Sequence, residues 1–401
     1  MKSILFVINT MGMGGGEKAI LELLKQIDLK KYQVSLFVLT GQGELIDQIP
    51  EGVKVLNEQY FPISVLNYTG KIRLVKTVVK NLLTRGIIFK RMGYITENLW
   101  DMIRKGSIRY DKLFWKILSD GAQRLDNHYD LAVAYLEGGA AYYIASHVNA
   151  GKKAAFIHTN YGLAGYNRKL DEDSYLEFDS IFTVAENVKE AFLSAYPECK
   201  DRTKVLYNLI DRDRIVKKAK EPGGFSDGFD GFRILTVGRL VPEKAHDIKI
   251  KAMEILKRAR KGFRWYVLGE GKLRKKLENQ IRRAGLEKDF ILLGTVNNPF
   301  PYYAQCDLYV HGTYLEGKSV AIEEAQILGC AILVSDYSGV KEQVRDGVDG
   351  EVCKLEPEAL AQKILDFADH PEKRKVYGLA ASKRERANAL TEVNKLLELL
   401  S

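Results

Sequence analysis

The sequence has few cysteines and lacks long apolar runs, and each lack argues against a class of protein. Its four cysteines are far apart and form no CxxC pair: Cys199, Cys306, Cys330 and Cys353. This spacing indicates neither a zinc site nor a disulfide framework, and it fits a reducing, cytoplasmic setting. No uncharged apolar stretch of about 18 residues occurs, so no transmembrane helix is predicted.

Length and composition are typical of a globular protein with more than one domain. The chain of 401 residues is too long for one ordinary domain. Hydrophobic residues make up 46% of it and charged residues 28%, which are globular values. The apolar run near the N-terminus stops at Asn9, and no small-residue cleavage site follows it. We therefore expect a first strand there rather than a signal peptide.

The net charge of +9 is concentrated in residues 71–118, where twelve basic residues face only Glu97, Asp101 and Asp111. Basic residues alternate there with apolar and aromatic ones, including Trp100 and Trp115. This pattern is typical of a peripheral helix that lies on an anionic bilayer, and membrane contact is our prediction. A solvated helical face with a packed inner stripe is the alternative. Nucleic acid is disfavoured because no helix-turn-helix, zinc or RNA-binding signature accompanies the charge.

Apolar, β-rich runs alternate with helical patterns in both halves of the chain. Continuous apolar strands separated by helices predict parallel sheets covered on both faces. We therefore predict an α/β fold with two facing doubly wound, Rossmann-like domains and a cleft between them. The runs expected to form strands are residues 4–9, 34–39, 131–136, 154–158, 181–185 and 203–208, then 233–238, 264–269, 290–294, 307–312 and 331–336.

The predicted boundaries follow from these runs and from a Gly-rich stretch between them. Residues 1–215 are expected to form the first domain and residues 232–385 the second. Residues 216–231, which include EPGGFSDGFDG, are expected to be a linker, and residues 386–401 a C-terminal helix that packs back on the first domain. Ligands of such sheets bind at the carboxyl ends of the strands, and the motifs below follow strands.

A glycine-rich loop, Gly12-Met13-Gly14-Gly15-Gly16, follows the first strand and begins a helix. Its amides can approach a phosphate closely, although glycine also simply permits a tight turn. A dinucleotide-binding fingerprint would need a third glycine where Glu17 stands. The second strand also ends without an acidic residue for an adenosine ribose, so NAD is disfavoured.

Two cations, Arg239 and Lys244 in VGRLVPEK, follow the first strand of the second half. Five residues apart on one loop, they can bind the two phosphates of a diphosphate. Each charge at ~4 Å contributes about 4 kcal/mol at an effective dielectric near 20, before desolvation is subtracted. Part of this attraction would act on charge that develops on a leaving nucleotide. A solvated basic turn is the alternative.

Two carboxylates, Glu316 and Glu324, enclose a Gly-Lys-Ser turn in EGKSVAIEEA. The turn is predicted to begin a helix over residues 319–328. The amides of Gly317, Lys318 and Ser319 would then be helix-start donors suited to an anion, with hydroxyl groups bound on either side. An ordinary amphipathic helix is the alternative for this segment taken alone.

Together these motifs resemble the donor half of family 4 glycosyltransferases of the GT-B type. The resemblance covers the second domain almost throughout and is looser in the first. The motifs that carry it are GRLVPEK, LGEGKLR (268–274), LLGTVNNP (292–299) and EGKSVAIEEA, and in the first domain GGGEKAI (14–20), His158 in FIHTN and NLID (208–211).

The resemblance implies a role for each matching residue. His158, Glu316, Arg239 and Lys244 would be the catalytic set, with His158 beside the reacting sugar and both cations on the diphosphate. Glu324 would bind the ribose of the donor, and Glu316 would bind its sugar. The diphosphate would be contacted by Gly317 and the amides of Lys318, Ser319 and Val320, with Gly15 and Gly16 approaching across the cleft. Backbone around Thr295 and Val296 would lie near the base, uracil being the usual one. No cofactor other than this co-substrate is expected.

Some features depart from the family pattern or compete with it. Lys318 stands where many relatives have an aromatic residue, which would add a third cation near the diphosphate, and Ala245 stands where glycine is frequent. The runs 211–213 and 171–173 mimic the metal-binding DxD of the other glycosyltransferase architecture. Two complete strand-helix units argue against that architecture, so no metal site is predicted. The loop around Glu137 is expected on the acceptor side.

The resemblance thus implies a retaining hexosyltransferase that uses a UDP-sugar and a lipid-linked or glycan acceptor. Its setting would be cell-surface polysaccharide biosynthesis, at the inner face of the plasma membrane. Two alternatives stay open. One is a nucleotide-sugar epimerase of the same architecture, and the other is a catalytically inactive, membrane-associated nucleotide-sugar-binding protein. Donor sugar, acceptor and linkage are not specified by the sequence.

Overall fold

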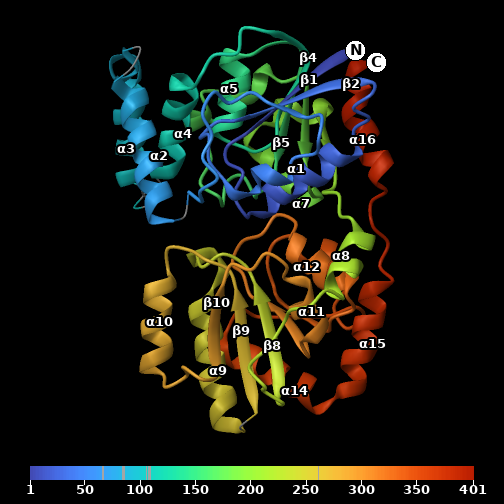
Figure 1. The fold of residues 1–401 in the computed structure, drawn as a ribbon. Coiled ribbons are helices and arrows are strands. Elements are labelled where there is room, and N and C mark those ends of the chain that lie inside the picture. The colour runs from blue at the N-terminus through green and yellow to red at the C-terminus, as the bar shows by residue number, and fades with distance from the viewer. Residues whose placement is uncertain (66, 84–85, 105, 107–109, 261) are drawn as a thin grey trace. The chain divides into compact units, whose positions relative to one another are not determined.

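The computed structural model of the chain describes residues 1–65, 67–83, 86–104, 106, 110–260 and 262–401, which form two compact units (Figure 1). The first unit comprises Met1–Ile210 and Ala387–Ser401, and the second comprises Asp211–Arg386. Each is built around one parallel sheet with helices packed on it. This is the layer arrangement that the alternation of apolar strands and helices predicted.

The first unit contains a parallel sheet of seven strands in the order β3-β2-β1-β4-β5-β6-β7. Strand β1 is almost wholly buried because its apolar residues face helices on both sides of the sheet. The strand order changes direction between β1 and β4, where doubly wound sheets bind ligands. The strands are β1 (Lys2–Ile8), β2 (Tyr32–Val38), β3 (Lys54–Val55), β4 (His128–Ala134), β5 (Asn149–Ile157), β6 (Ser180–Thr183) and β7 (Thr203–Val205).

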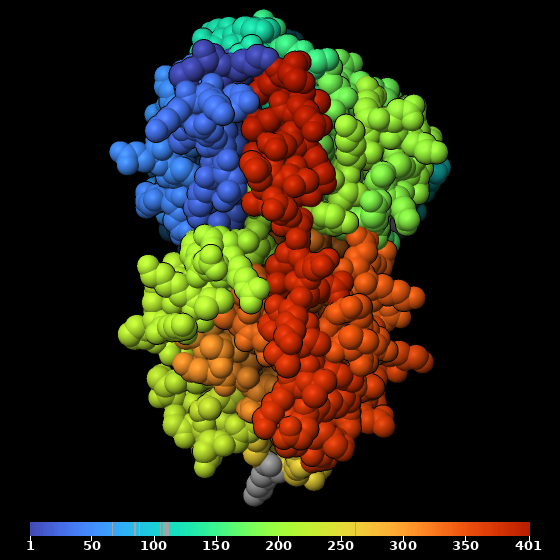
Figure 2. Space-filling view, turned by 90° about the vertical axis from the view of Figure 1, so that its right-hand side faces the viewer, coloured from blue at the N-terminus to red at the C-terminus, as the bar shows by residue number. Residues whose placement is uncertain are grey.

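The C-terminal helix α16 (Ala389–Leu397) belongs to the first unit. Val393 and Leu396 lie in the same buried cluster as β1 and α1, and Glu392 accepts a hydrogen bond from the Tyr207 amide at 2.9 Å. In Figure 2, the red residues of this helix lie between the blue N-terminal and the green residues of the same unit. The other helices of the unit are α1 (Gly15–Gln26), α2 (Tyr68–Leu83), α3 (Ile87–Arg104), α4 (Tyr110–Gly121), α5 (Gly139–His147), α6 (Arg168–Asp171) and α7 (Glu186–Ala195).

The basic segment 71–118 consists largely of the helices α2, α3 and α4, which pack on one another at one side of the first unit (Figure 1). Part of the predicted segment, residues 84–85, 105 and 107–109, lies outside the described residues. Among its described residues, α2 and α3 leave several large apolar side chains exposed, whereas α4 buries Leu113 and Ile117 against its neighbours. The segment therefore has a packed inner side and an apolar outer side.

The second unit contains a parallel sheet of six strands in the order β10-β9-β8-β11-β12-β13. Its order changes direction between β8 and β11. The strands are β8 (Phe232–Val237), β9 (Phe263–Leu268), β10 (Phe290–Gly294), β11 (Leu308–His311), β12 (Ile332–Ser335) and β13 (Glu351–Cys353). The helices are α8 (Arg212–Ala219), α9 (His246–Ala259), α10 (Arg274–Arg283), α11 (Phe300–Gln305), α12 (Val320–Ile327), α13 (Val340–Gln343), α14 (Pro357–Asp369) and α15 (Pro371–Ser382).

The stretch expected as a linker, residues 216–231, lies inside the second unit. It begins within α8 and then packs on the sheet, where Phe225 lies 4.3 Å from the ring of Tyr266 and Asp227 binds Arg264. The glycines permit the turns, but the aromatic and charged residues between them anchor the stretch. The short strands β3 and β13 are absent from the sequence-based list because two or three residues carry no periodic apolar signal.

Candidate functional site

The main group of predicted site residues lies at the point where the second sheet changes direction. Lys244 comes from the loop after β8, and Glu316 comes from the loop after β11. The Lys244 Nζ contacts Glu316 Oε2, and both side chains are largely buried. Burial opposes ionisation of Glu316, but Lys244 and His311 outweigh it and hold the pKa of this carboxyl below its usual range. The structure therefore joins the predicted diphosphate cation to the predicted sugar carboxylate.

His311, the last residue of β11, is the second partner of Glu316. Its Nε2 lies 3.0 Å from Glu316 Oε2, and its Nδ1 lies 3.0 Å from the hydroxyl of Tyr309. Burial, assisted by the nearby charge of Lys244, lowers the pKa of His311 to about 4. The ring is therefore neutral near pH 7 and can donate through only one nitrogen.

Glu324 projects from α12 and is buried, with 4% of its surface exposed. Its Oε2 accepts a hydrogen bond from the Tyr303 hydroxyl at 3.0 Å, and the Tyr303 ring packs on Tyr309 at 5.3 Å. Both predicted carboxylates thus have tyrosine or histidine partners from α11 and β11. Such partners fix acceptor oxygens in place, which is what recognition of sugar and ribose hydroxyls requires.

The turn before α12 is held more tightly than the sequence indicated. The amide of Ser319 donates to Gln343 Oε1 at 2.7 Å, and Gln343 Nε2 donates to the Ser319 carbonyl at 2.9 Å. Lys318, expected as a third cation for the diphosphate, forms an ion pair of 2.9 Å with Glu323. The Ser319 amide and the Lys318 charge are therefore both engaged within the unit, because side chains from α12 and α13 reach this turn. Their contact with a diphosphate stays a prediction.

Lys249 of α9 connects the two loops of the site. Its buried Nζ donates to the carbonyl of Lys244 at 2.6 Å and to that of Gly312 at 2.9 Å. Thr313 adds a hydrogen bond of 2.9 Å to the carbonyl of Glu243. Burial, with the neighbouring Lys244, holds the pKa of Lys249 well below its usual value. The loops after β8 and β11 are thereby fixed to each other.

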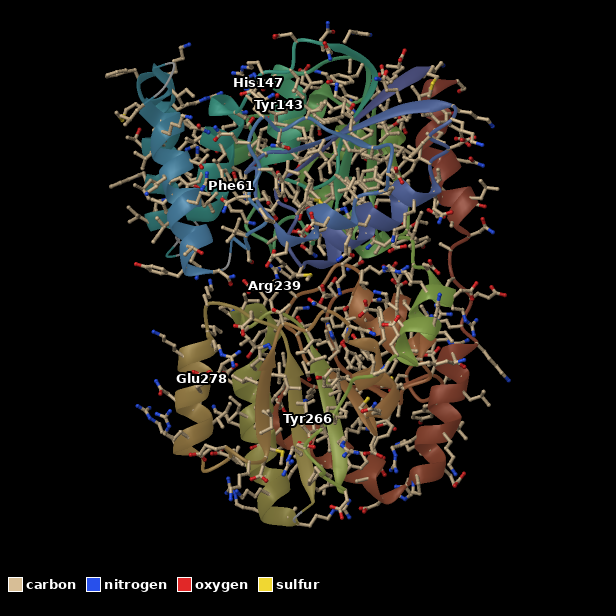
Figure 3. All side chains as sticks on the ribbon, viewed as in Figure 1. Phe61, Tyr143, His147, Arg239, Tyr266 and Glu278 are labelled. Atoms are coloured by element: carbon tan, nitrogen blue, oxygen red, sulfur yellow. The ribbon has the colours of Figure 1, made fainter. Side chains whose placement is uncertain are left out.

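Arg239 is exposed at the end of the second unit where the strands finish (Figure 3), and its guanidinium has no partner among the described residues. It is thus available to an anion. Thr295 and Val296 follow β10, and Thr295 is exposed. Ala245 adopts φ 44°, in the left-handed region. Glycine, which the family pattern has at this position, would adopt this conformation without strain.

The remaining predicted residues lie in the first unit. Gly15 and Gly16 begin α1, and a Cβ at Gly16 would come within 2.7 Å of Leu136 and 3.8 Å of His158 Nδ1. The structure therefore brings Gly16 and His158 together after β1 and β5. Glu137 lies beside them, because its carboxylate accepts from the His158 amide at 2.9 Å and from the Thr159 hydroxyl at 2.6 Å.

The His158 ring presents one nitrogen without a protein partner. Burial lowers its pKa, and the Glu137 charge offsets this only in part. Its Nε2 is buried and has no hydrogen-bond partner among the described residues. A neutral imidazole with such a nitrogen is suited to accept a hydrogen bond from a ligand hydroxyl.

Comparison with known proteins tests the family resemblance. Residues 227–384 match the family model "Glycosyl transferases group 1". The resemblance to family 4 glycosyltransferases is confirmed. One relative, the Campylobacter jejuni N-acetylgalactosamine-N,N'-diacetylbacillosaminyl-diphospho-undecaprenol 4-alpha-N-acetylgalactosaminyltransferase, is 31% identical over 53% of this chain and 57% of its own. A second from that organism, GalNAc-alpha-(1->4)-GalNAc-alpha-(1->3)-diNAcBac-PP-undecaprenol alpha-1,4-N-acetyl-D-galactosaminyltransferase, is 25% identical over 91% of this chain and 88% of its own.

Solved structures show the same architecture over the full length. HepE from Anabaena, crystallised with UDP, has a TM-score of 0.67 and 20% identity, with 100% of this chain and 99% of HepE covered. TarM has a TM-score of 0.63 and 12% identity, with 100% and 99% covered. These likenesses and the two parallel sheets confirm the predicted GT-B fold with two Rossmann-like domains. The predicted cleft between the domains stays a prediction.

The two DxD-like runs have structural roles in this glycosyltransferase-like chain. Asp211 caps α8 by accepting from the Arg214 amide at 2.8 Å. Asp171 is buried and accepts from the hydroxyls of Tyr142, Tyr161 and Tyr196. Among the described residues, no group of three or more His, Cys, Asp or Glu side chains could hold a metal ion. Nor does any helix that could be searched meet the length and hydropathy needed to span a membrane.

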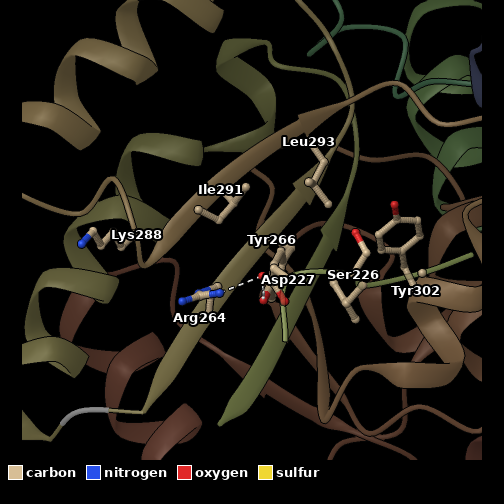
Figure 4. A pocket seen from close by; sticks show the side chains of 10 residues that line it. Ser226, Asp227, Arg264, Tyr266, Lys288, Ile291, Leu293 and Tyr302 are labelled. Carbon is tan, nitrogen blue, oxygen red and sulfur yellow. Dashed lines mark hydrogen bonds and ion pairs between the residues drawn. The ribbon is translucent and has the colours of Figure 1, made fainter. Parts of the chain in front are cut away.

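A separate cavity of about 310 Å³ opens on the second unit between the anchored stretch 224–227 and strands β9 and β10 (Figure 4). The aromatic residues Phe225, Tyr266 and Tyr302 and the basic residues Arg264 and Lys288 are among those that line it. Its lining contains none of the residues that the family resemblance assigns to the donor.

Sequence reasoning missed the residues that support the site: Tyr303, Tyr309, His311, Lys249 and Gln343. One signal was available for His311, because it ends the apolar strand LYVHG directly before the turn to Glu316. The others lie in elements far from the motif and show nothing unusual in sequence. Only their contacts identify them.

Proposed function

We propose that the protein is a glycosyltransferase that moves a sugar from a nucleotide-diphosphate donor, a UDP-sugar, to an acceptor. The observation that carries the proposal is the pairing of Lys244 and Glu316 where the second sheet changes direction, with exposed Arg239 on the same loop as Lys244. Cations there would hold the diphosphate and stabilise the charge that develops as the bond to the sugar breaks. Glu324 would bind the ribose and Glu316 the sugar.

The named activities of similar proteins support the choice of donor and acceptor. The two Campylobacter relatives are named as N-acetylgalactosaminyltransferases whose names include undecaprenol-linked saccharides. HepE was crystallised with UDP-glucose as well as with UDP. We therefore propose a UDP-sugar as donor and a lipid-linked glycan as acceptor, in the biosynthesis of a cell-surface polysaccharide.

We propose transfer with retention of the anomeric configuration, as the family resemblance implies. The leaving diphosphate would help to deprotonate the incoming hydroxyl, so no covalent nucleophile, cofactor or metal is needed. His158 would accept a hydrogen bond from the sugar through its unpartnered Nε2. The loop at Glu137, adjacent to His158, is proposed to line the acceptor side.

We further propose that the outer side of α2 and α3 rests on the anionic inner face of the plasma membrane. Exposed apolar residues of α2 recur at helical spacing and would share one face of that helix. They are Tyr68, Ile72, Val75, Val79 and Leu83, and α3 adds Phe89, Met92, Trp100 and Ile103. Basic side chains are exposed on the same helices: Lys71, Lys76, Lys80, Lys90 and Arg104. An apolar face with basic residues matches an anionic bilayer, where a lipid-linked acceptor would lie.

A screen of nucleotide sugars by thermal shift tests the proposal, since a bound donor stabilises the fold by mass action. The donor that stabilises most is then supplied with lipid-linked glycan, and released nucleotide and extended glycan are measured. Lys244→Ala and Glu324→Ala should abolish transfer while the fold is retained. Epimerisation of the donor without transfer would assign an isomerase instead, and donor binding with neither reaction would assign a binding protein.

A further inference from the structure

The partners of Glu316 pose a problem for donor binding. Its carboxylate is in contact with Lys244, the cation that the proposed function assigns to the diphosphate. When Lys244 binds a diphosphate instead, Glu316 loses its ionic partner. The Glu316 side chain is only 19% exposed, so water replaces that partner poorly. The free-energy cost of leaving a buried carboxylate without a partner exceeds the net stabilisation that the ion pair contributed. Some other group must therefore hold Glu316 at that stage.

His311 meets this requirement because its position does not depend on Lys244. The ring is 2% exposed and is fixed at both nitrogens, by Glu316 on one side and by the Tyr309 hydroxyl on the other. Tyr309 in turn packs on Tyr303, the partner of Glu324. His311 ends a central strand of the sheet, so its backbone is also held by neighbouring strands.

The contacts specify which nitrogen carries the proton. An ionised carboxylate only accepts hydrogen bonds, so Nε2 must donate to Glu316. A neutral ring then has its lone pair on Nδ1, which accepts from the Tyr309 hydroxyl. Burial raises the pKa of Tyr309 well above its usual value, and this keeps that hydroxyl protonated. Tyr309 thereby selects the Nε2–H tautomer of His311.

We propose that His311, oriented by Tyr309, is a positioning residue that retains Glu316 when Lys244 leaves it for the diphosphate of the donor. The inference rests on the proposed function, because it assumes that a nucleoside diphosphate binds at Lys244. It assigns to His311 no contact with the sugar. Its consequence is that His311 should matter for diphosphate binding only when a carboxylate is present at position 316.

A double-mutant cycle with UDP as the probe tests this consequence by calorimetry. His311→Leu should weaken UDP binding about tenfold in the otherwise unchanged protein, and by less than twofold when Glu316→Gln is also present. A purely structural role would give the same loss in both backgrounds and would overturn the proposal. His370→Leu, at an exposed histidine of the same unit, is the matched control for the substitution.

Nitrogen-15 NMR of histidine tests the geometry without any ligand. The His311 signals are identified as those absent from the spectrum of His311→Leu. In the unchanged protein they should show a protonated Nε2 and an unprotonated Nδ1. Tyr309→Phe should shift this tautomer balance and weaken UDP binding in part. A protonated Nδ1 in the unchanged protein would overturn the inference. If the unchanged protein does not bind UDP, the proposed donor is refuted. The inference about His311 is then decided by the tautomer that the NMR spectrum shows. If His311→Leu does not fold, the cycle is run with Tyr309→Phe under the same criteria.

Discussion

Lys244 and Glu316 are 72 residues apart in the chain, and their side chains are in contact. The contact arises because β8 and β11 are neighbours in the sheet, which places the loops that follow them side by side. Each side chain belongs to a separate sequence motif. Their pairing shows that the two motifs lie together in the fold, and that Lys244 has an ionic partner within the unit.

Removal of the Glu316 charge should therefore strengthen the binding of UDP, which has no sugar. Glu316→Gln is expected to raise the affinity for UDP at least about fivefold, because Lys244 then binds the diphosphate without giving up a buried ion pair. Transfer from a UDP-sugar should fall at the same time. Isothermal titration and a turnover assay measure the two effects. Glu287→Gln, at an exposed carboxylate of the same unit, is the control, and an unchanged or weaker UDP affinity in Glu316→Gln contradicts the prediction.

Gln343 should be important for the stability of the second unit. Its side chain bonds the amide and carbonyl of Ser319, and its Oε1 lies 3.1 Å from the Tyr337 hydroxyl. Gln343→Ala leaves these buried groups without their partner and should lower the free energy of unfolding by about 2–4 kcal/mol. Denaturant titration measures this quantity. Gln362→Ala, at an exposed position of α14, should cost less than about 0.5 kcal/mol, and equal losses in both variants would refute the role.

The exposed apolar side chains of α2 and α3 should dominate membrane binding. Leu83, Phe89 and Trp100 are 71%, 83% and 70% exposed, and replacing all three with serine should lower binding to anionic vesicles at least about tenfold. Vesicle flotation measures this loss. Serine at Val376 and Leu379, exposed apolar residues of α15, should have no effect. If both sets of variants float equally well, the outer face of α2 and α3 is a solvated surface.

Charge removal alone is a less selective test of the same surface. Arg91, one of the basic residues of the segment, is engaged by Asp120 at 2.5 Å and by Glu172 at 2.7 Å. Lys116 also binds Glu172 and is buried. Lys90 and Arg104 are exposed, so their replacement should reduce the salt-sensitive part of binding without unfolding the unit. Lys105 lies outside the described residues.

Asp171 should make the stability of the first unit depend on pH. Burial raises its pKa to about 6, although the three tyrosine hydroxyls and Lys116 oppose the shift. The folded state therefore binds a proton more readily than the unfolded state, whose Asp pKa is about 3.9. As the pH rises from about 4 to about 6, the contribution of Asp171 to the free energy of unfolding is lost, on the order of 2–3 kcal/mol in total.

Asp171→Asn removes this titration. The quantity to compare is the difference in melting temperature, unchanged protein minus Asp171→Asn. We expect this difference to be about 5 °C larger at pH 4.5 than at pH 7. Differential scanning calorimetry at the two pH values measures the difference. Asp213→Asn, at an exposed position, is the control. A difference that does not change with pH would mean that Asp171 keeps an ordinary pKa in the fold.

Much of the architecture could be predicted because it depends on local patterns. The runs at residues 4–9 and 233–238 are largely apolar, without strict alternation, so they predict strands that are covered on both faces of a parallel sheet. The motifs at Arg239 and Glu316 were expected after strands, and both are found there. The role of each motif residue toward a donor stays a prediction.

The supporting contacts could not be predicted in the same way. Gln343 reaches Ser319 from α13, and Lys249 reaches Gly312 from α9, so each contact depends on how whole elements pack. The partner of Lys318 was likewise not predicted. The position of Lys318 in the motif indicated a cation for the diphosphate, but one turn of helix brings Glu323 to it as a partner.

The sequence by itself determined two parallel α/β units, the places where chemistry-bearing loops follow strands, and a basic, apolar segment at residues 71–118. These follow from periodicity, turn chemistry and charge, which are properties of neighbouring residues. Only the tertiary structure decided that Lys244 is paired with Glu316, that His311 holds the same carboxylate, and that α16 completes the core of the first unit. Such contacts join residues distant in the chain, so strand order and helix packing determine them.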